Sequence, residues 1–264
     1  MNERLIHKNE KVYFITSLVI SIITYLLLIA SLIGIVYILI GLIITFFLHG
    51  IMVAHFRSNG SKLTEQQFPE IHEKVLDLCR RMGIQKIPAV YVIQSGGLLN
   101  AFATRFFGRN FVVLYSDIFE LVESGNQAEV TFIIAHELAH IRRQHITKQL
   151  LILPALWVPF LGTAYSRACE YTCDLIATAY TGNEKAAVNA LTILAIGRNL
   201  YKRVNIADYL LNYSKETGFF IWFCHILSTH PPLPKRIKEI NYFSTYPQLY
   251  GYQSSGFEVT EISA

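Results

Sequence analysis

The apolar pattern is most pronounced near the N-terminus, where residues 12–56 contain no Asp, Glu, Lys or Arg. As one continuous helix this stretch would be about 68 Å long at about 1.5 Å per residue. A bilayer core is only about 30 Å thick and is crossed by about 20 apolar residues. The pattern therefore predicts two membrane-spanning helices, residues 12–31 and 35–54, joined around Gly34. The length argues against a cleaved signal peptide, whose apolar region has about 7–15 residues.

Basic residues flank both ends of the apolar stretch. Arg4, Lys8 and Lys11 precede it, and Arg57 and Lys62 follow it. Because Lys and Arg accumulate on the cytoplasmic side of membrane proteins, we expect both flanks in the cytoplasm, with a short turn outside. The sequence thus predicts a multi-pass protein of the cell membrane whose later part faces the cytoplasm.

Shorter elements follow the apolar stretch. Apolar residues at helical spacing predict a helix over residues 65–82 that ends at Gly83. Three strands rich in Val, Ile, Tyr and Phe are predicted at residues 89–94, 98–104 and 111–115, with turns at residues 96–97 and 108–110. We expect them to form a small antiparallel sheet. An exposed edge of this sheet can bind a peptide as an added strand, or it can be an ordinary sheet margin.

The remainder of the chain is mostly helical in pattern. Helices are predicted at residues 128–148, 165–180 and 183–196. Residues 150–165 are apolar but contain Pro154 and Pro159, so they form either a kinked core helix or a segment that dips into the membrane, and core contact is favoured. Residues 218–227 leave the same two alternatives open. The tail after residue 242 is expected to be a loose surface extension.

The predicted helix at residues 128–148 contains the motif His136-Glu137-Leu138-Ala139-His140. At about 100° per residue, the two histidines lie about 40° apart on one helical face. Two imidazoles so placed can hold one zinc ion, and the Glu137 carboxylate beside them can accept a proton from an attacking water. Two polar residues on a solvated helix face are the alternative. The apolar neighbours argue against that alternative: Ile133, Ile134, Leu138 and Ile141.

A second pair of polar residues, Glu170 and Asp174, lies one helical turn apart in the predicted helix at residues 165–180. A zinc site of this kind needs a third protein ligand, and Glu170 can supply it. Asp174 can accept a hydrogen bond from the outer nitrogen of a ligand imidazole and so fix its tautomer. An exposed acidic pair is the alternative, but the surrounding apolar residues favour burial.

A third polar element is Ser228-Thr229-His230-Pro231-Pro232. Prolines are tolerated in the first turn of a helix and Thr229 can cap it, which would hold His230 at a helix entrance. There it can donate a hydrogen bond to an oxyanion. By composition alone, an ordinary loop histidine is the better interpretation. The other histidines are interpreted as structural, and His145 in particular is predicted to face away, about 180° around the helix from His136.

Composition narrows the function classes. Hydrophobic residues make up 52% of the chain and charged residues 16%, with a mean hydropathy of +0.35, as in membrane proteins. The net charge of +4 is modest, and no basic block carries interleaved aromatic residues, so nucleic-acid binding is not expected. The uncharged spans argue against a small-solute transporter. The four cysteines lack the CxxC spacing of a zinc site and are expected to be small buried packing residues.

Four motifs carry a resemblance to a known family. They are NAFAT at 100–104, HELAH at 136–140, EYTCD at 170–174 and STHPPLPKRI at 228–237. Their order resembles that of membrane-bound gluzincin metallopeptidases, the group that contains HtpX-type heat-shock proteases and zinc CAAX prenyl proteases. The resemblance spans roughly residues 65–240. Cys173 stands where the family commonly has alanine. The linker between the second and third motifs is short, which argues against an extra membrane hairpin there.

The resemblance implies a role for each matching residue. It implies one Zn²⁺ ion held by His136, His140 and Glu170, with Glu137 as the catalytic base. It also implies Asp174 as a hydrogen-bonding partner of a ligand and His230 as a donor to the transition state. Part of the substrate cleft is implied for Asn100, Ala101, Phe102 and Ala103.

Together the observations predict an α+β, zincin-like catalytic domain that is mostly helical. It would occupy residues 57–242, after a membrane anchor at 1–56 and before a tail at 243–264. The expected function is zinc-dependent endopeptidase cleavage of membrane or membrane-associated proteins, including membrane-protein quality control. A catalytically silent, zinc-binding membrane adaptor is the alternative, although Glu137 argues against it because a structural site needs no base. The expected partners are protein or peptide substrates and the lipid bilayer, and the sequence does not specify an oligomeric state.

Overall fold

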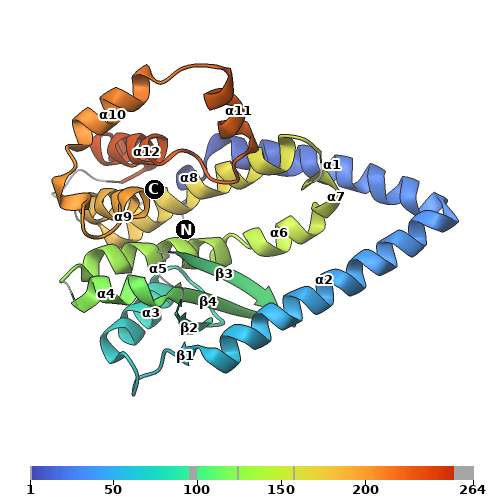
Figure 1. Ribbon diagram of the computed structural model, residues 1–264, viewed down its shortest axis with the longest axis horizontal. Helices are drawn as coiled ribbons and strands as arrows, with labels where there is room; N and C mark the ends of the chain where they lie inside the picture. Colours follow the sequence, from blue (N-terminus) through green and yellow to red (C-terminus); the bar gives the residue numbers. More distant parts are fainter. Residues whose placement is uncertain (1, 95–99, 124, 157, 253–264) are drawn as a thin grey trace.

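The computed structural model describes residues 2–94, 100–123, 125–156 and 158–252. Two long helices, α1 (Lys8–Ala30) and α2 (Leu32–Asn59), meet at Ser31, which caps α2. Figure 1 shows them diverging from this turn as a V, with the rest of the chain between and beyond their open ends. Both helices are long and apolar enough to cross a membrane, and almost none of the residues in either apolar window are buried. The two predicted helices are therefore confirmed, with the turn three residues earlier than Gly34.

The sheet has four strands: β1 (Ser61–Lys62), β2 (Ala89–Ile93), β3 (Ala101–Phe106) and β4 (Arg109–Tyr115), in the order β1-β2-β4-β3. The expectation of an antiparallel sheet is wrong in one respect, because β2 runs parallel to β4. The chain reverses twice between these strands, and β2 and β3 occupy opposite edges of β4. The predicted turn at residues 96–97 and the start of the predicted strand at 98–99 lie outside the described residues.

A two-residue turn joins β3 to β4. Phe107 and Gly108 have φ angles of 47° and 73°. Positive φ at both central residues is the backbone of a type I′ turn, whose twist matches that of the flanking strands. The exposed Phe107 ring contacts Phe46 of α2, with ring centroids 5.6 Å apart. The turn therefore fastens the edge of the sheet to the second long helix.

Helices form the remaining body. Their bounds are α3 (Pro69–Arg81), α4 (Ser116–Glu123), α5 (Gln127–Arg142), α6 (His145–Leu151), α7 (Leu153–Leu156), α8 (Leu161–Thr181), α9 (Glu184–Ile196), α10 (Ile206–Lys215), α11 (Phe219–Leu227) and α12 (Leu233–Thr245). Three short 3₁₀ helices are η1 (Glu3–Leu5), η2 (Tyr201–Arg203) and η3 (Pro247–Tyr250). In Figure 1, α5 and α8 cross the centre, with the sheet on the outer side of α5 and with α9 and α12 beside α8. This confirms a mostly helical α+β fold with a small sheet.

The predicted helix at residues 128–148 is broken in its second half. α5 ends at Arg142, and Gln144 has a left-handed φ of 57° before α6 begins at His145. A non-glycine residue rarely adopts this conformation. The break changes the direction of α6, so angles counted along one continuous helix no longer apply to His145.

The segment at residues 150–165 packs against α1. Ile152, Ala155 and Tyr165 are buried there, and the Ala155 backbone N–H donates a hydrogen bond of 3.2 Å to the Ser21 hydroxyl. These residues do contact the rest of the protein, but the helix they contact is the first predicted span, so both alternatives stay open for this segment. In contrast, α11 has no buried residue.

Both ends of the described chain join the main core. Leu5 and Tyr252 belong to the same buried cluster as residues of α5 and α8. The Asn2 side chain donates a hydrogen bond of 2.6 Å to the Tyr250 carbonyl. The expectation of a loose tail is therefore wrong for residues 243–252, because Phe243, Pro247 and Tyr252 are buried. Residues 253–264 lie outside the described part.

Candidate metal centre

Three predicted ligands converge between α5 and α8. The Nε2 atoms of His136 and His140 lie 3.2 Å apart. Glu170 Oε2 lies 3.4 Å from His136 Nε2, and its Oε1 lies 3.3 Å from His140 Nε2. The histidines converge because a four-residue spacing places them one turn apart on α5. Glu170 meets them because α8 packs along α5 through the main core.

The donor set suits a metal ion. Two imidazole nitrogens and one carboxylate oxygen are the protein ligands of a common class of catalytic zinc sites, in which the fourth position is open. The surrounding charge also favours a cation here. Burial acts to lower the pKa of His136, but Asp174 and Glu170 outweigh it and raise that pKa to about 10. The pair of carboxylates thus stabilises positive charge at this point.

Asp174 lies behind His136, on the side away from the other ligands. Its Oδ1 is 3.0 Å from His136 Nδ1, so this carboxylate faces the outer nitrogen of the predicted ligand. Asp174 is completely buried. Burial acts to raise its pKa, but the Arg236 guanidinium outweighs this effect and the pKa of Asp174 falls below its ordinary value of 3.8. Asp174 is therefore ionised at neutral pH.

Arg236 is a residue of the site that the sequence analysis did not identify. Its Nε and Nη2 donate hydrogen bonds of 2.6 and 2.7 Å to the two oxygens of Asp174, and its Nη1 lies 3.1 Å from Glu170 Oε2. A signal was available, because Arg236 immediately precedes Ile237 and lies one turn before Ile240, and both are fully buried. An arginine on the apolar face of a helix indicates a buried ion pair.

Glu137 faces the same cleft as the metal ligands. A pocket of about 350 Å³ is lined by Glu137, His136 and His140 on α5, by Glu170 on α8, and by residues at the start of β3. These last residues are the four predicted in the substrate cleft: Asn100, Ala101, Phe102 and Ala103. The structure thus brings the predicted base and the predicted substrate-binding segment to one cavity.

β3 is an edge strand, and its register determines which backbone groups face the cleft. The Tyr115 N–H donates to the Asn100 carbonyl at 3.1 Å, and Phe102 lies opposite Val113. Hydrogen-bonded pairs alternate along an antiparallel ladder. The backbone groups of Asn100 and Phe102 therefore form hydrogen bonds with β4. The backbone groups of Ala101 and Ala103 point to the opposite, free edge of β3. The free edge can accept an extended peptide.

His230 lies at the mouth of the pocket. Its side chain is 64% exposed, and its Nε2 lies 3.6 Å from Glu170 Oε1. The predicted cap is wrong, because α12 begins at Leu233 with Pro232 at its N-cap position. The Thr229 hydroxyl instead lies 3.0 Å from His230 Nδ1. His230 precedes the helix in a short turn that leaves its imidazole free to approach the cleft.

The prediction that His145 faces away from the site is wrong. Its Nδ1 lies 3.0 Å from His140 Nδ1, and the residue is only 1% exposed. The helix break at Gln144 causes this difference. Burial, together with the nearby His140 and Lys148, lowers the pKa of His145 to about 4, so its imidazole is neutral at neutral pH.

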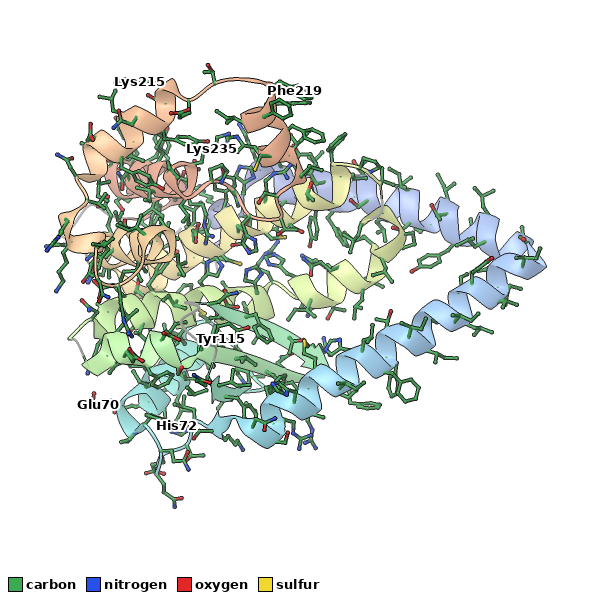
Figure 2. The ribbon with its side chains drawn as sticks, in the orientation of Figure 1. Glu70, His72, Tyr115, Lys215, Phe219 and Lys235 are labelled. Atoms are coloured by element: carbon green, nitrogen blue, oxygen red, sulfur yellow. The ribbon has the colours of Figure 1, made fainter. Side chains whose placement is uncertain are left out.

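The remaining histidines and the cysteines lie outside the ligand set. His49 Nε2 lies 3.0 Å from the Thr104 hydroxyl. His72 lies on α3, at the lower left of Figure 2, and does not line the pocket that the metal ligands share. All four cysteines are free, and Cys79, Cys169 and Cys173 are buried as expected. Cys224 is exposed, so the expectation of a buried packing role is wrong for it.

Comparisons with known proteins agree with this geometry. The model of peptidase family M48 matches residues 65–161 and 150–244. A protease HtpX homolog of Pelotomaculum thermopropionicum is 27% identical over 237 residues, covering 72% of this chain and 81% of the relative. One from Streptococcus pyogenes is 26% identical and covers 69% and 76%. The plastoglobule-localized metallopeptidase 48 of Arabidopsis thaliana is 27% identical and covers 69% and 59%. The matched residues span more than half of the chain and include the whole candidate centre, so the protein belongs to peptidase family M48 and is a metallopeptidase.

Proposed function

We propose that this protein is a membrane-anchored, zinc-dependent endopeptidase that cleaves membrane or membrane-associated proteins, with a role in membrane-protein quality control. One observation carries the proposal: a two-histidine, one-glutamate ligand set and the Glu137 carboxylate share a cleft with the free edge of β3. A purely structural metal site would need neither an adjacent base nor an open strand edge.

Each residue of the cleft has a proposed role in peptide hydrolysis. Zinc, when bound, would polarise the scissile carbonyl and make the attacking water more acidic. Glu137 accepts a proton from the water and returns it to the leaving amine. His230 donates a hydrogen bond to the oxyanion that forms on the scissile carbonyl. Asp174, itself held by Arg236, orients the His136 imidazole.

The free edge of β3 supports an endopeptidase rather than an enzyme that removes single terminal residues. Within the described part of the chain no other strand pairs with this edge, so an extended peptide could pair with it and continue past the metal centre in both directions. Backbone pairing also tolerates many side chains. This fits a protease that acts on varied protein substrates.

Several features support the lipid bilayer as a partner. The apolar side chains of α1 and α2 are mostly exposed, as they would be to lipid. α11 also exposes Phe219, Phe220 and Trp222, and Figure 2 shows Phe219 at the outer rim of the molecule. With the basic flanks of the spans, this supports a multi-pass protein whose catalytic half, residues 57–242, faces the cytoplasm.

One experiment tests this proposal against a silent zinc-binding adaptor. The purified full-length protein and its Glu137→Gln variant are compared for zinc content and for digestion of casein. We expect one zinc ion per chain in both, and casein cleavage by the wild type that falls by about 10²–10⁴-fold in the variant. Equal cleavage by the two proteins would contradict the role of Glu137. Zinc-loaded wild type without any cleavage would favour the adaptor.

A further inference from the structure

The outer nitrogens of the two candidate imidazole ligands have different neighbours. When a neutral imidazole binds a metal through Nε2, its proton lies on Nδ1, and this N–H needs an acceptor that fixes the ring. For His136 the available acceptor is the Asp174 carboxylate, 3.0 Å from Nδ1, although the present ring orientation does not form a hydrogen bond to it. For His140, the Nδ1 atom instead faces the Nδ1 atom of His145 at 3.0 Å.

Two facing Nδ1 atoms can share only one proton. If His140 Nδ1 carries it, then His145 Nδ1 must accept, which leaves Nε2 as the only ring nitrogen of His145 that can carry a proton. His145 Nε2 lies 3.3 Å from Glu10 Oε1. This nitrogen is buried and makes no hydrogen bond within the described part of the chain. A buried N–H requires an acceptor, and the Glu10 carboxylate is within reach of a small side-chain rotation.

Glu10 belongs to the first turn of α1 and is 1% exposed. Arg143 Nη2 donates a hydrogen bond of 2.7 Å to its Oε1, and Lys148 Nζ lies 3.7 Å from the same oxygen. The pattern parallels the other side of the site, where Arg236 binds Asp174. Each ligand imidazole is thus linked to a buried carboxylate that an arginine neutralises, directly for His136 and through a second imidazole for His140.

We propose that Glu10 and His145 are positioning residues for the metal centre: Glu10 fixes the tautomer of His145, and His145 orients His140 for metal binding. This inference rests on the proposed zinc site. It implies that the first turn of α1 contributes to metal binding through Glu10.

A second metal ion is the competing explanation. Glu10, His145 and Cys169 offer ligand atoms within 4.8 Å of one another. The charges disfavour a cation there, because Arg143 and Lys148 already surround the Glu10 carboxylate. The zinc stoichiometry distinguishes the two explanations: one ion per chain supports the positioning role, and a second ion lost on Glu10→Gln overturns it.

The first test measures zinc affinity of the full-length protein in detergent by competition with a chromophoric chelator. We expect His145→Leu to weaken binding by about 10–100-fold, the usual loss when a group behind a metal ligand is removed. His145→Asn, whose amide oxygen can still accept near the Nδ1 position, should lose less. His72→Leu on α3 is the matched control and should bind as tightly as wild type.

A double-mutant cycle separates the proposed chain from a general structural role of Glu10. Glu10→Gln should weaken zinc binding in the wild-type background but add nothing in the His145→Leu background, because residues of one network are not additive. Equal losses in both backgrounds would show that Glu10 acts elsewhere and would overturn the proposal.

The second test needs no variant and reports the proton positions directly. Long-range ¹⁵N NMR of histidine-labelled, zinc-loaded protein should find the His140 proton on Nδ1 and the His145 proton on Nε2. A His145 proton on Nδ1 would overturn the proposal. If the wild type binds no zinc, the proposed function fails as well. If the wild type binds zinc and the Glu10 and His145 variants bind it as tightly as the wild type, only the positioning role of Glu10 and His145 fails.

Discussion

The Arg236 guanidinium binds both carboxylate oxygens of Asp174, at 2.6 and 2.7 Å, in a fully buried pair between α12 and α8. The third nitrogen of the same group lies 3.1 Å from Glu170. One arginine therefore balances two carboxylates, one of which is a proposed metal ligand and the other the partner of His136. The helix that follows the His230 turn is thereby tied to the metal centre.

Removal of this arginine should strongly destabilise the protein. Arg236→Met leaves two buried carboxylates without their counter-charge, and breaking a buried ion pair from one side typically costs about 3–5 kcal/mol. Arg236→Lys should lose less but should not restore wild-type stability, since an ammonium cannot bind both oxygens in parallel. Thermal melting of metal-free protein measures the effect, with the exposed Arg203→Met as control. A wild-type melting temperature for Arg236→Met would refute the proposed balance of charges.

The metal-free protein should be most stable in a mildly acidic window. The pKa of Asp174 is lowered below 3.8, so its ionised carboxylate stabilises the folded protein above that pH. This stabilisation is lost as the pH falls further. The pKa of His136 is raised from 6.5 to about 10, so its contribution is complete below pH 6.5 and is lost as the pH rises toward 10. Melting temperatures of chelator-treated protein from pH 3 to 10 should therefore peak between these limits. His136→Gln should flatten the alkaline side of the curve of melting temperature against pH. An unchanged alkaline side would contradict the raised pKa of His136.

Zinc should hold α5 and α8 together, because its proposed ligands lie on both helices. Chelation should therefore lower the melting temperature as well as abolish cleavage. The His136→Ala/His140→Ala double variant should contain no zinc after purification, as measured by elemental analysis. Asp174→Asn should keep the site but bind zinc about 10–100-fold more weakly. Stoichiometric zinc in the double variant would refute the ligand assignment.

Two proline substitutions in β3 should affect different properties, the first substrate binding and the second stability. The backbone N–H of Ala103 points to the free edge, so Ala103→Pro should preserve the sheet while removing one donor to a bound peptide. We expect KM for a peptide substrate to rise about 2–10-fold, the value of one hydrogen bond, with zinc affinity unchanged. Phe102→Pro, whose N–H bonds to β4, should instead lower the melting temperature. An unchanged KM for Ala103→Pro would argue against strand addition.

The topology can be mapped by cysteine accessibility in intact cells. Since Cys224 is the exposed native cysteine, Cys224→Ser provides a suitable background. An impermeant thiol reagent should label Ile33→Cys at the turn between α1 and α2 but not Asn59→Cys at the end of α2, because basic residues flank both spans. The reverse labelling would place the cleft, and its substrates, outside the cell.

The sequence predicted the parts of the site that depend on helix geometry alone. His136, His140 and the Glu170–Asp174 pair follow from a four-residue spacing, which holds wherever the helix is continuous. It could not predict the break at Gln144, because no glycine or proline marks it and tertiary packing imposes the left-handed conformation. The role of Glu10 could not be predicted for a related reason: its partners lie more than 130 residues away, and no local sequence pattern indicates such a contact.

The parallel pairing of β2 with β4 was missed because strand composition does not specify strand order. Val- and Ile-rich segments fit either neighbour, and only the type I′ turn at Phe107-Gly108 specifies which two strands form the hairpin. Its signal was weak, since the favoured residues at the first turn position are Asn, Asp and Gly rather than Phe.

The contacts of residues 2–7 with helices that come much later in the sequence have a consequence for biosynthesis. Asn2 bonds to Tyr250, His7 stacks on Tyr171, and Leu5 lies in a core built largely from later helices. During translation the first turn of α1 emerges before its partners: His7 meets Tyr171 only after α8 has been made, and Asn2 meets Tyr250 later still. The candidate centre is likewise incomplete until Arg236 on α12 has been made, so under the proposed function a nascent chain inserted among potential substrates would be proteolytically inert until then.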